Sequence, residues 1–289
     1  MKSYSQMLTQ FGISSGKTDT SSNAAAAIWF NDGIRSVLGM PINWKFLESS
    51  FTLTTTTNIS TYFLPYNFDK LSSVKILVGT FNYVVKQVKN RDEWNRITSV
   101  VYQSSYPIFC YLNNRTIEFF PTPQSTGNTI TFNYKKRAVD LQNTDYTTGT
   151  ITATNNSTTI TGAGTTFTSG MVGRYLKVNA DGNWYLITGF TNATTIAIEQ
   201  PYQGTTVAGA AYTIGEMSVL PENHDMIPIY YALMQYWRPT QLDKARENER
   251  YYNEEVKKLV DDNIMSSMDT GLTLDYQIED PNFYPQNIT

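Results

Sequence analysis

The spacing of apolar residues predicts two helices at the start of the chain. Apolar side chains recur every three or four positions over residues 1–12 and again over residues 24–38, as on one face of a helix. Asn23 stands at the N-cap position of the second helix. Gly39 and Pro41 follow its last turn, and both residue types commonly mark a helix end.

Helical spacing returns in the last quarter of the chain. Residues 226–237 carry one apolar stripe, and residues 241–265 carry a second. Only residues 238–240 separate them, so the two helices are expected to pack as an antiparallel pair. The final residues, 269–289, are polar and acidic. They are expected to form an extended tail that becomes ordered on a neighbouring protein.

After residue 43 the apolar period changes to two, which is typical of strands. Residues 51–54 and 61–64 alternate on either side of Asn58 and are expected to pair as a hairpin. Residues 74–85 are expected to form two strands that meet near Gly79-Thr80. The other expected elements are a short helix, a two-strand hairpin and a single strand, at residues 90–96, 108–111 with 116–120, and 129–134.

Residues 144–215 differ in composition from the rest of the chain. They are dense in Thr, Gly and Asn and nearly free of charge. The sequence Asn-Ala-Asp-Gly-Asn at 179–183 is a strong signal for a hairpin turn. The expected strands lie at residues 149–153, 158–161, 174–178, 184–188, 195–199 and 211–214. So many strands in a short segment predict a small all-β sandwich or barrel.

Together these elements predict an α+β fold with an inserted domain. The helical core combines the N-terminal helices with the C-terminal helical hairpin, and an antiparallel β-region accompanies it. This core is expected to be discontinuous, comprising residues 1–143 and 216–268. Residues 144–215 form the inserted all-β domain, and residues 269–289 form the tail.

Composition narrows the classes of function. The net charge of −3 and the pI of about 5.3 give no overall positive field, which disfavours a protein that grips DNA. A surface past which DNA slides stays compatible with these values. The 20 tyrosines suit large protein–protein contacts, although half-buried strand residues explain them equally well. No apolar run approaches the ~18 residues of a membrane span, and residues 1–20 lack the apolar stretch of a signal peptide.

No set of residues has the spacing of a catalytic motif. The single cysteine, Cys110, lies in an apolar run and is expected to be a buried structural thiol. His224, the only histidine, is expected to lie on the surface at a helix start, without partners for a metal. The glycine-rich residues 12–18 are one position short of a phosphate-binding loop. We therefore predict a protein that is not an enzyme and binds no cofactor or metal.

A carbohydrate-active site stays open, because paired carboxylates need only be close in space. Trp184 and Tyr185 would then serve as a sugar platform, and the alternative is ordinary packing on a strand face. The candidate carboxylates are Glu48, Asp92, Glu93, Asp181 and Glu199.

Several short segments of the sequence resemble those of a known protein family. Three of them are FNYKKRAVDL at 132–141, LPENHD at 220–225 leading into YYAL at 230–233, and DKARENERYY at 243–252. With the order of helices and strands, they resemble the head-to-tail connector proteins of tailed bacteriophages, also called adaptor or neck proteins. Within residues 144–215, the phrases GRYLKV at 173–178, GNWY at 182–185 and PYQGTT at 201–206 are similar to a β-module that recurs in phage structural proteins.

The resemblance implies a structural virion protein that is assembled in the host cytoplasm. It implies a homo-oligomeric ring, usually dodecameric, that joins the portal protein of the capsid to tail or further neck proteins. DNA would pass through the channel of this ring without sequence-specific binding, and no membrane is involved. The candidate interface residues are Leu242, Tyr252, Val256, Leu259, Leu274, Tyr276, Phe283 and Tyr284. The candidate DNA-proximal residues, which could instead form a solvated strand edge, are Lys135, Lys136 and Arg137.

Two other classes of protein fit part of the pattern. One is a different tail, baseplate or fibre-attachment protein, although the C-terminal helical pair argues against a mainly β tail-tube subunit. The other is a carbohydrate-binding or host-binding protein in which residues 144–215 are the working domain.

Overall fold

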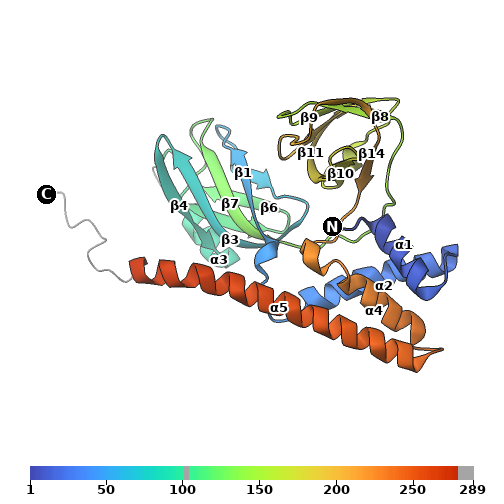
Figure 1. The fold of residues 1–289 in the computed structure, drawn as a ribbon. Helices are drawn as coiled ribbons and strands as arrows, with labels where there is room; N and C mark the ends of the chain where they lie inside the picture. Colours follow the sequence, from blue (N-terminus) through green and yellow to red (C-terminus); the bar gives the residue numbers. More distant parts are fainter. Residues whose placement is uncertain (101–103, 279–289) are drawn as a thin grey trace. The chain divides into compact units, whose positions relative to one another are not determined.

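The computed structural model describes residues 1–100 and 104–278, and within them the side chains of residues up to 265. The chain is α+β, as predicted, with helices and two curled, seven-stranded sheets (Figure 1). It divides into two compact units. One unit is Trp44–Val139, and the other combines Met1–Asn43 with Asp140–Thr289.

The unit Trp44–Val139 is built on a single sheet. Its strands lie in the order β1-β7-β3-β4-β5-β6-β2, and among them only β4 and β5 pair in parallel. Its core consists of side chains from β3 to β7, among them Ile76, Phe119 and Phe132. The elements are η1 Lys45–Leu47, β1 Glu48–Thr54, β2 Thr61–Phe63, β3 Phe68–Val78, β4 Phe81–Val88, α3 Arg91–Thr98, β5 Phe109–Asn113, β6 Thr116–Phe120 and β7 Thr129–Lys136.

Tight turns in this unit follow the prediction. β3 and β4 form an antiparallel hairpin across Gly79-Thr80, where Gly79 has a φ of 62° that glycine adopts without strain. β5 and β6 pair across Asn113-Asn114, and Asn114 also has a positive φ. The short helix α3 begins after Asn90, whose side chain accepts a hydrogen bond from the Asp92 amide.

The hairpin predicted around Asn58 is wrong. β1 pairs with β7, and β2 pairs with β6. The backbone of Thr55 explains the separation, because its amide donates to Asn128 and its carbonyl accepts from Gly127. These bonds hold the end of β1 beside the start of β7, so the chain cannot turn directly back on itself.

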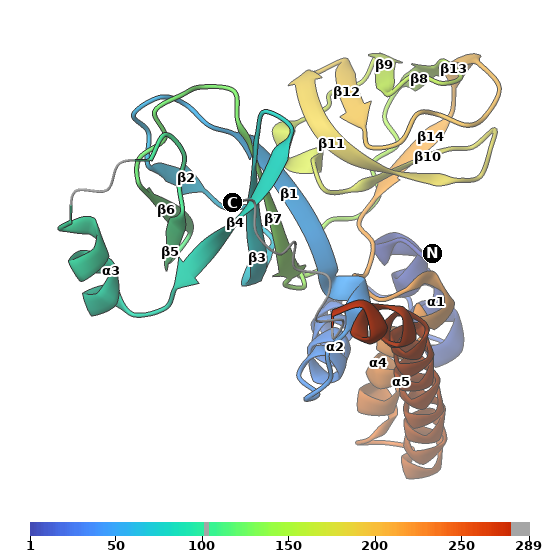
Figure 2. The same ribbon diagram turned by 90° about the vertical axis from the view of Figure 1, so that its left-hand side faces the viewer.

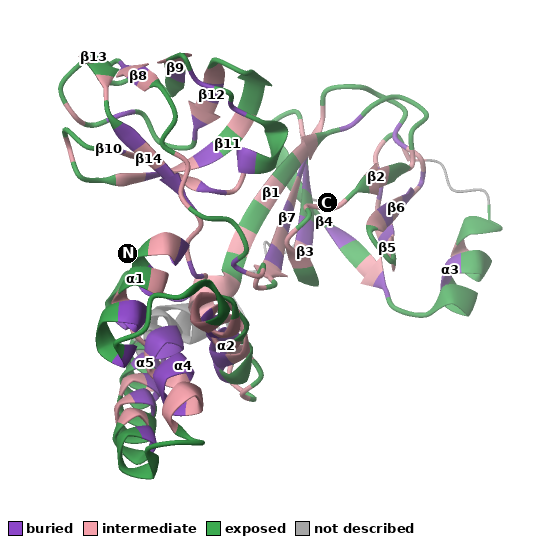
Figure 3. Cartoon of the chain, turned by 90° about the vertical axis from the view of Figure 1, so that its right-hand side faces the viewer, coloured by how far each residue is buried: buried purple, intermediate pink, exposed green. Residues whose placement is uncertain are grey.

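Four helices belong to the other unit: α1 Tyr4–Ser15, α2 Thr20–Leu38, α4 Ile227–Trp237 and α5 Leu242–Ile278. Phe11 of α1 meets Phe30 of α2 and Tyr236 of α4 edge to face, so three helices share one aromatic cluster. α4 is largely buried among its neighbours (Figure 3). Its N-terminal turn contains Pro228, where the missing amide hydrogen costs no helix hydrogen bond.

Contacts along α4 and α5 confirm the antiparallel pair. Trp237, at the end of α4, lies under the ammonium group of Lys244 near the start of α5, at 4.3 Å from the ring centroid. Tyr230, two turns earlier, packs against Tyr251. The residue nearer the N-terminus of α4 therefore contacts the residue further from the N-terminus of α5, as in two antiparallel helices.

Two helix boundaries differ from the prediction. α2 begins at Thr20 and is capped by Asp19, whose carboxylate accepts hydrogen bonds from the Ser22 amide and hydroxyl. Asn23 lies inside the helix because the better-placed acidic cap comes one turn earlier. α5 continues to Ile278, so an end near Met265 and an extended backbone from residue 269 are wrong for residues 269–278. Residues 279–289 lie outside the described part of the chain.

The second sheet lies entirely within residues 150–215 and has the strand order β13-β8-β9-β12-β11-β10-β14. β10 and β11 form the hairpin predicted at 179–183. β13 was missed because Val-Ala-Gly-Ala has no clear alternation and contains Gly209 at positive φ. The elements are β8 Thr150–Ala153, β9 Thr159–Ala163, η2 Ser169–Met171, β10 Tyr175–Val178, β11 Trp184–Asn192, β12 Thr195–Ile198, β13 Val207–Ala210 and β14 Tyr212–Gly215, followed by η3 Glu222–His224.

Glu216 joins the segments through which the chain enters and leaves this sheet. Its carboxylate accepts hydrogen bonds from the amides of Gln142 and Asn143, at 2.7 and 2.8 Å, and from the Asn143 side chain. It also accepts from the guanidinium of Arg174, at 3.4 Å, and Arg174 is itself buried. The backbone carbonyl of Glu216 accepts from Tyr4, which links α1 to the same junction.

Candidate interaction surfaces

The predicted DNA-proximal residues lie at one end of the sheet in Trp44–Val139. Lys135 and Lys136 are the last residues of β7, both half-buried, and Arg137 follows them and is exposed. Lys135 faces Glu48 of β1 in the strand register. The structure thus brings the three basic residues together at a strand end, next to one carboxylate.

Arg137 also lines an open pocket of about 490 Å³. Arg115 contributes a second guanidinium, Asp69 contributes a carboxylate, and Phe63 and Tyr66 are exposed at its rim. The remaining lining residues are Leu64, Pro65, Phe68 and Asn114. An aromatic and basic lining of this kind suits contact with a protein surface or with phosphate groups.

A second open pocket, of about 500 Å³, is lined by strands β3, β4 and β5. Its charged residues are Asp69, Lys70 and Lys89. One wall is Tyr111, which stacks on Trp94 of α3 with ring centroids 5.6 Å apart. The Trp94 indole donates to Glu118 at 3.1 Å, so α3 is anchored on the sheet beside the pocket.

The distribution of charge is a feature that sequence analysis missed. Residues 44–139 contain eleven Lys and Arg but only five Asp and Glu, whereas the rest of the chain contains eleven and twenty. The unit Trp44–Val139 is therefore basic and the other unit is acidic, although the whole chain is close to neutral. The signal was present in the sequence, but it can be counted only once the unit boundaries are known.

The candidate interface residues fall into different settings. Tyr252, Val256 and Leu259 are buried within their own chain, so they stabilise the helices of the subunit and present no surface to a neighbour. Leu242 is 53% exposed at the start of α5. The side chains of Leu274 and Tyr276, and the whole of Phe283 and Tyr284, lie outside the described part of the structure.

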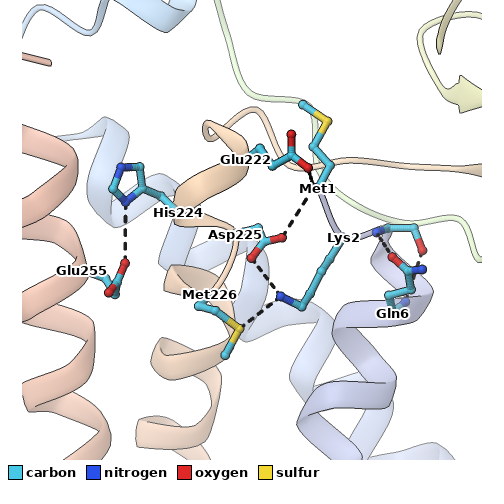
Figure 4. Close-up of polar contacts among 9 residues, drawn as sticks. Met1, Lys2, Gln6, Glu222, His224, Asp225, Met226 and Glu255 are labelled. Atoms are coloured by element: carbon cyan, nitrogen blue, oxygen red, sulfur yellow. Dashed lines mark hydrogen bonds and ion pairs between the residues drawn. The ribbon is translucent and has the colours of Figure 1, made fainter. Parts of the chain in front are cut away.

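His224 was predicted to lie on the surface, and this is wrong, since its side chain is only 5% exposed. Its Nε2 atom lies 3.0 Å from a carboxylate oxygen of Asp262. Its Nδ1 atom lies 3.7 Å from a carboxylate oxygen of Glu255, as Figure 4 shows. Both carboxylates belong to α5, which packs over η3. The position of His224 at the start of a predicted helix did not indicate that the long helix α5 would cover it.

The N-terminal segment is held beside η3 by further polar contacts (Figure 4). The Lys2 ammonium group lies 3.0 Å from Asp225 and 3.5 Å from the sulfur of Met226. The amino group of Met1 contacts Glu222. Ser3 caps α1 through a capping box with Gln6, so the first residues form an ordered part of the helical unit.

The residues proposed for a sugar site serve the β10–β11 turn instead. The Tyr185 ring belongs to the core of the second sheet, and its hydroxyl donates to Asp181 at 2.5 Å. Trp184 lies on the other face of the strand under Lys177, at 5.6 Å from the ring centroid. The two rings therefore do not form one exposed platform. In the described residues, no group of three or more His, Cys, Asp or Glu could hold a metal ion.

Cys110 is buried in the core of the unit Trp44–Val139, as predicted. Burial raises the pKa of its thiol to about 12. The thiol is therefore protonated and shielded at neutral pH, and its place is structural.

None of the helices in the described part of the chain is long and apolar enough to cross a bilayer. The two open pockets of the unit Trp44–Val139, with their basic and aromatic lining residues, are surfaces suited to contacts with other molecules. A family model described as SU10 adaptor protein matches residues 2–160, which is more than half of the chain. The match spans α1, α2, the complete unit Trp44–Val139 and β8.

The chain belongs to the SU10 adaptor protein family. It is therefore a phage adaptor-type structural protein and a component of the virion that associates with other virion proteins. The resemblance to phage adaptor proteins is confirmed at this level. No curated protein matches the sequence.

Proposed function

We propose that this chain is a subunit of a ring that joins the portal of the phage capsid to the tail and extends the DNA channel. The observation that carries the proposal is the adaptor family match, which covers the whole basic unit and the first two helices. A head-to-tail position also agrees with the resemblance of residues 132–141 and 220–252 to connector proteins.

A ring explains how modest contacts can give a stable joint. Closure makes each subunit contact two neighbours at once, so many weak interfaces act together. The charge distribution favours such an arrangement, because one chain carries both a basic and an acidic unit. Like surfaces would repel, whereas basic and acidic surfaces of successive subunits attract.

DNA is proposed to pass the ring without being bound by sequence. Lys135, Lys136 and Arg137 are a small basic group rather than a long basic groove, so they would touch phosphates weakly and non-specifically. The chain as a whole is acidic, which keeps DNA from sticking to the complex. No enzymatic step is part of this proposal.

The experiment is to mix the purified full-length chain with the portal protein of its phage and to image the complex by negative-stain electron microscopy. We expect an additional ring layer of the same symmetry on the outer face of the portal. A matched sample with a virion protein from elsewhere in the particle controls for non-specific adhesion. The absence of any added layer, at concentrations where the chain stays soluble, would count against the proposal.

Residues 144–215 are proposed to be a separate folding domain inserted into a core of residues 1–143 and 216–268. In support, every strand of the second sheet lies between residues 150 and 215, and the buried side chains of its core lie between residues 151 and 214. A fragment of residues 144–216 should give a strand-type circular dichroism spectrum and a cooperative melt. A random-coil spectrum would refute the independence of this domain.

A further inference from the structure

In the described residues, part of one edge of β4 has no strand partner. Along residues 81–85, β4 pairs with β3 on one side. On its other side β4 pairs with β5 only at residues 86–88, and within the described residues no strand pairs with residues 81–85 there. The two-residue turn makes Val78 and Phe81 a hydrogen-bonded pair, so the peptide groups of Asn82 and Val84 face the open side. The amide of Lys86, next in this series, already donates to Ile108 at 2.8 Å.

The two faces of this edge differ in chemistry. Phe81 and Tyr83 lie on the face that continues the core of the sheet, and they are 68% and 39% exposed, with the Tyr83 ring stacked on Tyr106 at 4.7 Å between ring centroids. Val84 lies on the opposite face, where it is 71% exposed and faces Lys75 across the strand pair. An exposed apolar edge strand is normally shielded or paired, because it attracts other chains. Figure 2 shows β4 next to β3, with α3 further along the chain.

Basic side chains surround the opposite face. Lys75 and Lys86 are exposed and share this face with Val84, because side chains two positions apart on a strand point to the same side. A strand that fits this edge should therefore present apolar side chains on one face and acidic side chains on the other.

The C-terminal segment of this chain has that pattern. Residues 266–289 contain four acidic residues and no basic residue. From residue 272 to 279 apolar and polar residues alternate strictly, in the sequence Leu-Thr-Leu-Asp-Tyr-Gln-Ile-Glu. Period two places the apolar residues on one face only if the backbone is extended, since a helix spreads alternate positions around its circumference. The Asp280-Pro281 that follows ends a strand naturally.

We propose that residues 272–279 of a neighbouring copy add as a strand to the open edge of β4. The backbone of the added strand would bond to the peptide groups of Asn82 and Val84 that face this side of β4. Its apolar row, Leu274, Tyr276 and Ile278, then lies beside Phe81 and Tyr83. Its polar row, which contains Asp275 and Glu279, then lies on the same face of the sheet as Lys86 of β4 and Lys75 of β3.

The addition requires the end of α5 to unwind, and the sequence makes this feasible. The backbone is helical to Ile278 in the single chain, but Gly271 and the β-branched Thr270 and Thr273 are weak helix formers. The last turns of a helix have low local stability, so an edge that satisfies the same backbone groups can compete with them.

The inference rests on the proposed ring, and it names the contact between successive subunits. Donor segment and acceptor edge are different surfaces of one chain, which is the requirement for a head-to-tail contact. Each copy would give its C-terminal segment to one neighbour and receive that of the other. The basic charge of one unit and the acidic charge of the tail then meet across the interface.

Cysteine cross-linking in the full-length chain tests this contact. A chain with Val84→Cys is mixed with a chain carrying Gln277→Cys, which keeps the apolar row intact, and the mixture is oxidised. The native Cys110 is buried and contributes little background. We expect a disulfide-linked dimer in the mixture and much less dimer with either variant alone.

The matched control replaces Val84→Cys by Thr52→Cys. Thr52 is exposed on β1, the edge strand at the end of the same sheet, but that strand offers polar exposed positions. Equal dimer yields with both acceptors would overturn the inference. A product formed only inside a chain that carries both Val84→Cys and Gln277→Cys would also overturn it, because the segment would then dock on its own subunit.

Charge reversal gives an independent measurement. Lys75→Glu combined with Lys86→Glu should lower the dimer yield by at least about fivefold, because like charges then face each other. Adding Asp275→Lys and Glu279→Lys to the partner chain should restore the yield, and failure to restore it would contradict the contact. If the chain with Lys75→Glu and Lys86→Glu loses binding to duplex DNA while its dimer yield is unchanged, these lysines contact DNA. That result would overturn the proposed strand contact.

The outcome separates this inference from the proposed function. If rings form on the portal but the disulfide-linked dimer does not form, the strand contact is refuted and the proposed ring still stands. The cross-link without rings on the portal would support the strand contact and refute the proposed function.

Discussion

Replacing Glu216 by alanine should loosen the junction between the second sheet and the N-terminal helix. The Glu216 carboxylate is only 17% exposed and is the ion-pair partner of Arg174, whose side chain is 10% exposed. It also accepts hydrogen bonds from the backbone amides of Gln142 and Asn143. Removing it leaves a buried guanidinium without its carboxylate.

The size of the effect follows from these contacts. Breaking a fully buried ion pair by removing one partner costs about 3–5 kcal/mol. Here the distance from the guanidinium is 3.4 Å and the carboxylate keeps some contact with water, so the loss should be smaller. Water can replace the partner of the Gln142 and Asn143 amides, because both residues are exposed. We expect a net loss of about 2 kcal/mol, with most of it due to Arg174.

Native-state hydrogen exchange measures this loss at the site. Amides of β10 and β14, which pair directly, should exchange about thirtyfold faster in the Glu216→Ala chain, since 1.4 kcal/mol corresponds to a factor of ten. Glu216→Gln keeps one of the two acceptor oxygens and should show a smaller increase. Glu199→Ala, at an exposed carboxylate after β12, is the control. Protection that differs less than about threefold between Glu216→Ala and this control would refute the reasoning.

Three further outcomes are expected. Gly33→Ala should destabilise the chain by about 1–3 kcal/mol in urea unfolding, because an added Cβ would lie 2.9 Å from that of Tyr231 on α4; an unchanged midpoint would contradict the close helix contact. Cys110 should not react with a thiol reagent at pH 8 until the chain is unfolded, since burial raises its pKa to about 12, and rapid labelling of the native chain would be inconsistent with that burial. His224→Ala should lower the melting temperature, because it removes a partly buried hydrogen bond to Asp262 worth about 1 kcal/mol; no change would mean that the contact does not contribute to stability.

Local signals identified most elements of this fold. The hairpins across Gly79-Thr80 and Asn113-Asn114 were predictable, because both strands and the turn lie within a few residues of one another. The helices α1, α4 and the first part of α5 followed from apolar spacing alone. The resemblance to phage adaptor proteins likewise depended on short phrases, and the family match confirms it at the coarse level.

Long-range partners were not predictable from local pattern. β1 pairs with β7, which lies about eighty residues later in the chain. The alternation of apolar and polar residues shows that a segment is a strand, but it does not show which other strand it pairs with. His224 became buried because α5 folds back over it, although its own sequence neighbourhood is polar. The sequence also could not show that Tyr252, Val256 and Leu259 are buried within their own chain, because an apolar stripe does not reveal whether its partner is the same chain.

The sequence by itself determined which segments are helical or extended, since those preferences depend on residues within one or two turns. Tertiary structure decided which strands pair, which apolar faces are already covered and where the unit boundaries fall. Those boundaries divide a nearly neutral chain into one basic and one acidic unit. The pairing of the described strands leaves residues 81–85 of β4 without a strand partner on one side. Pairing and burial depend on contacts between residues far apart in the chain, so only the folded arrangement could show them.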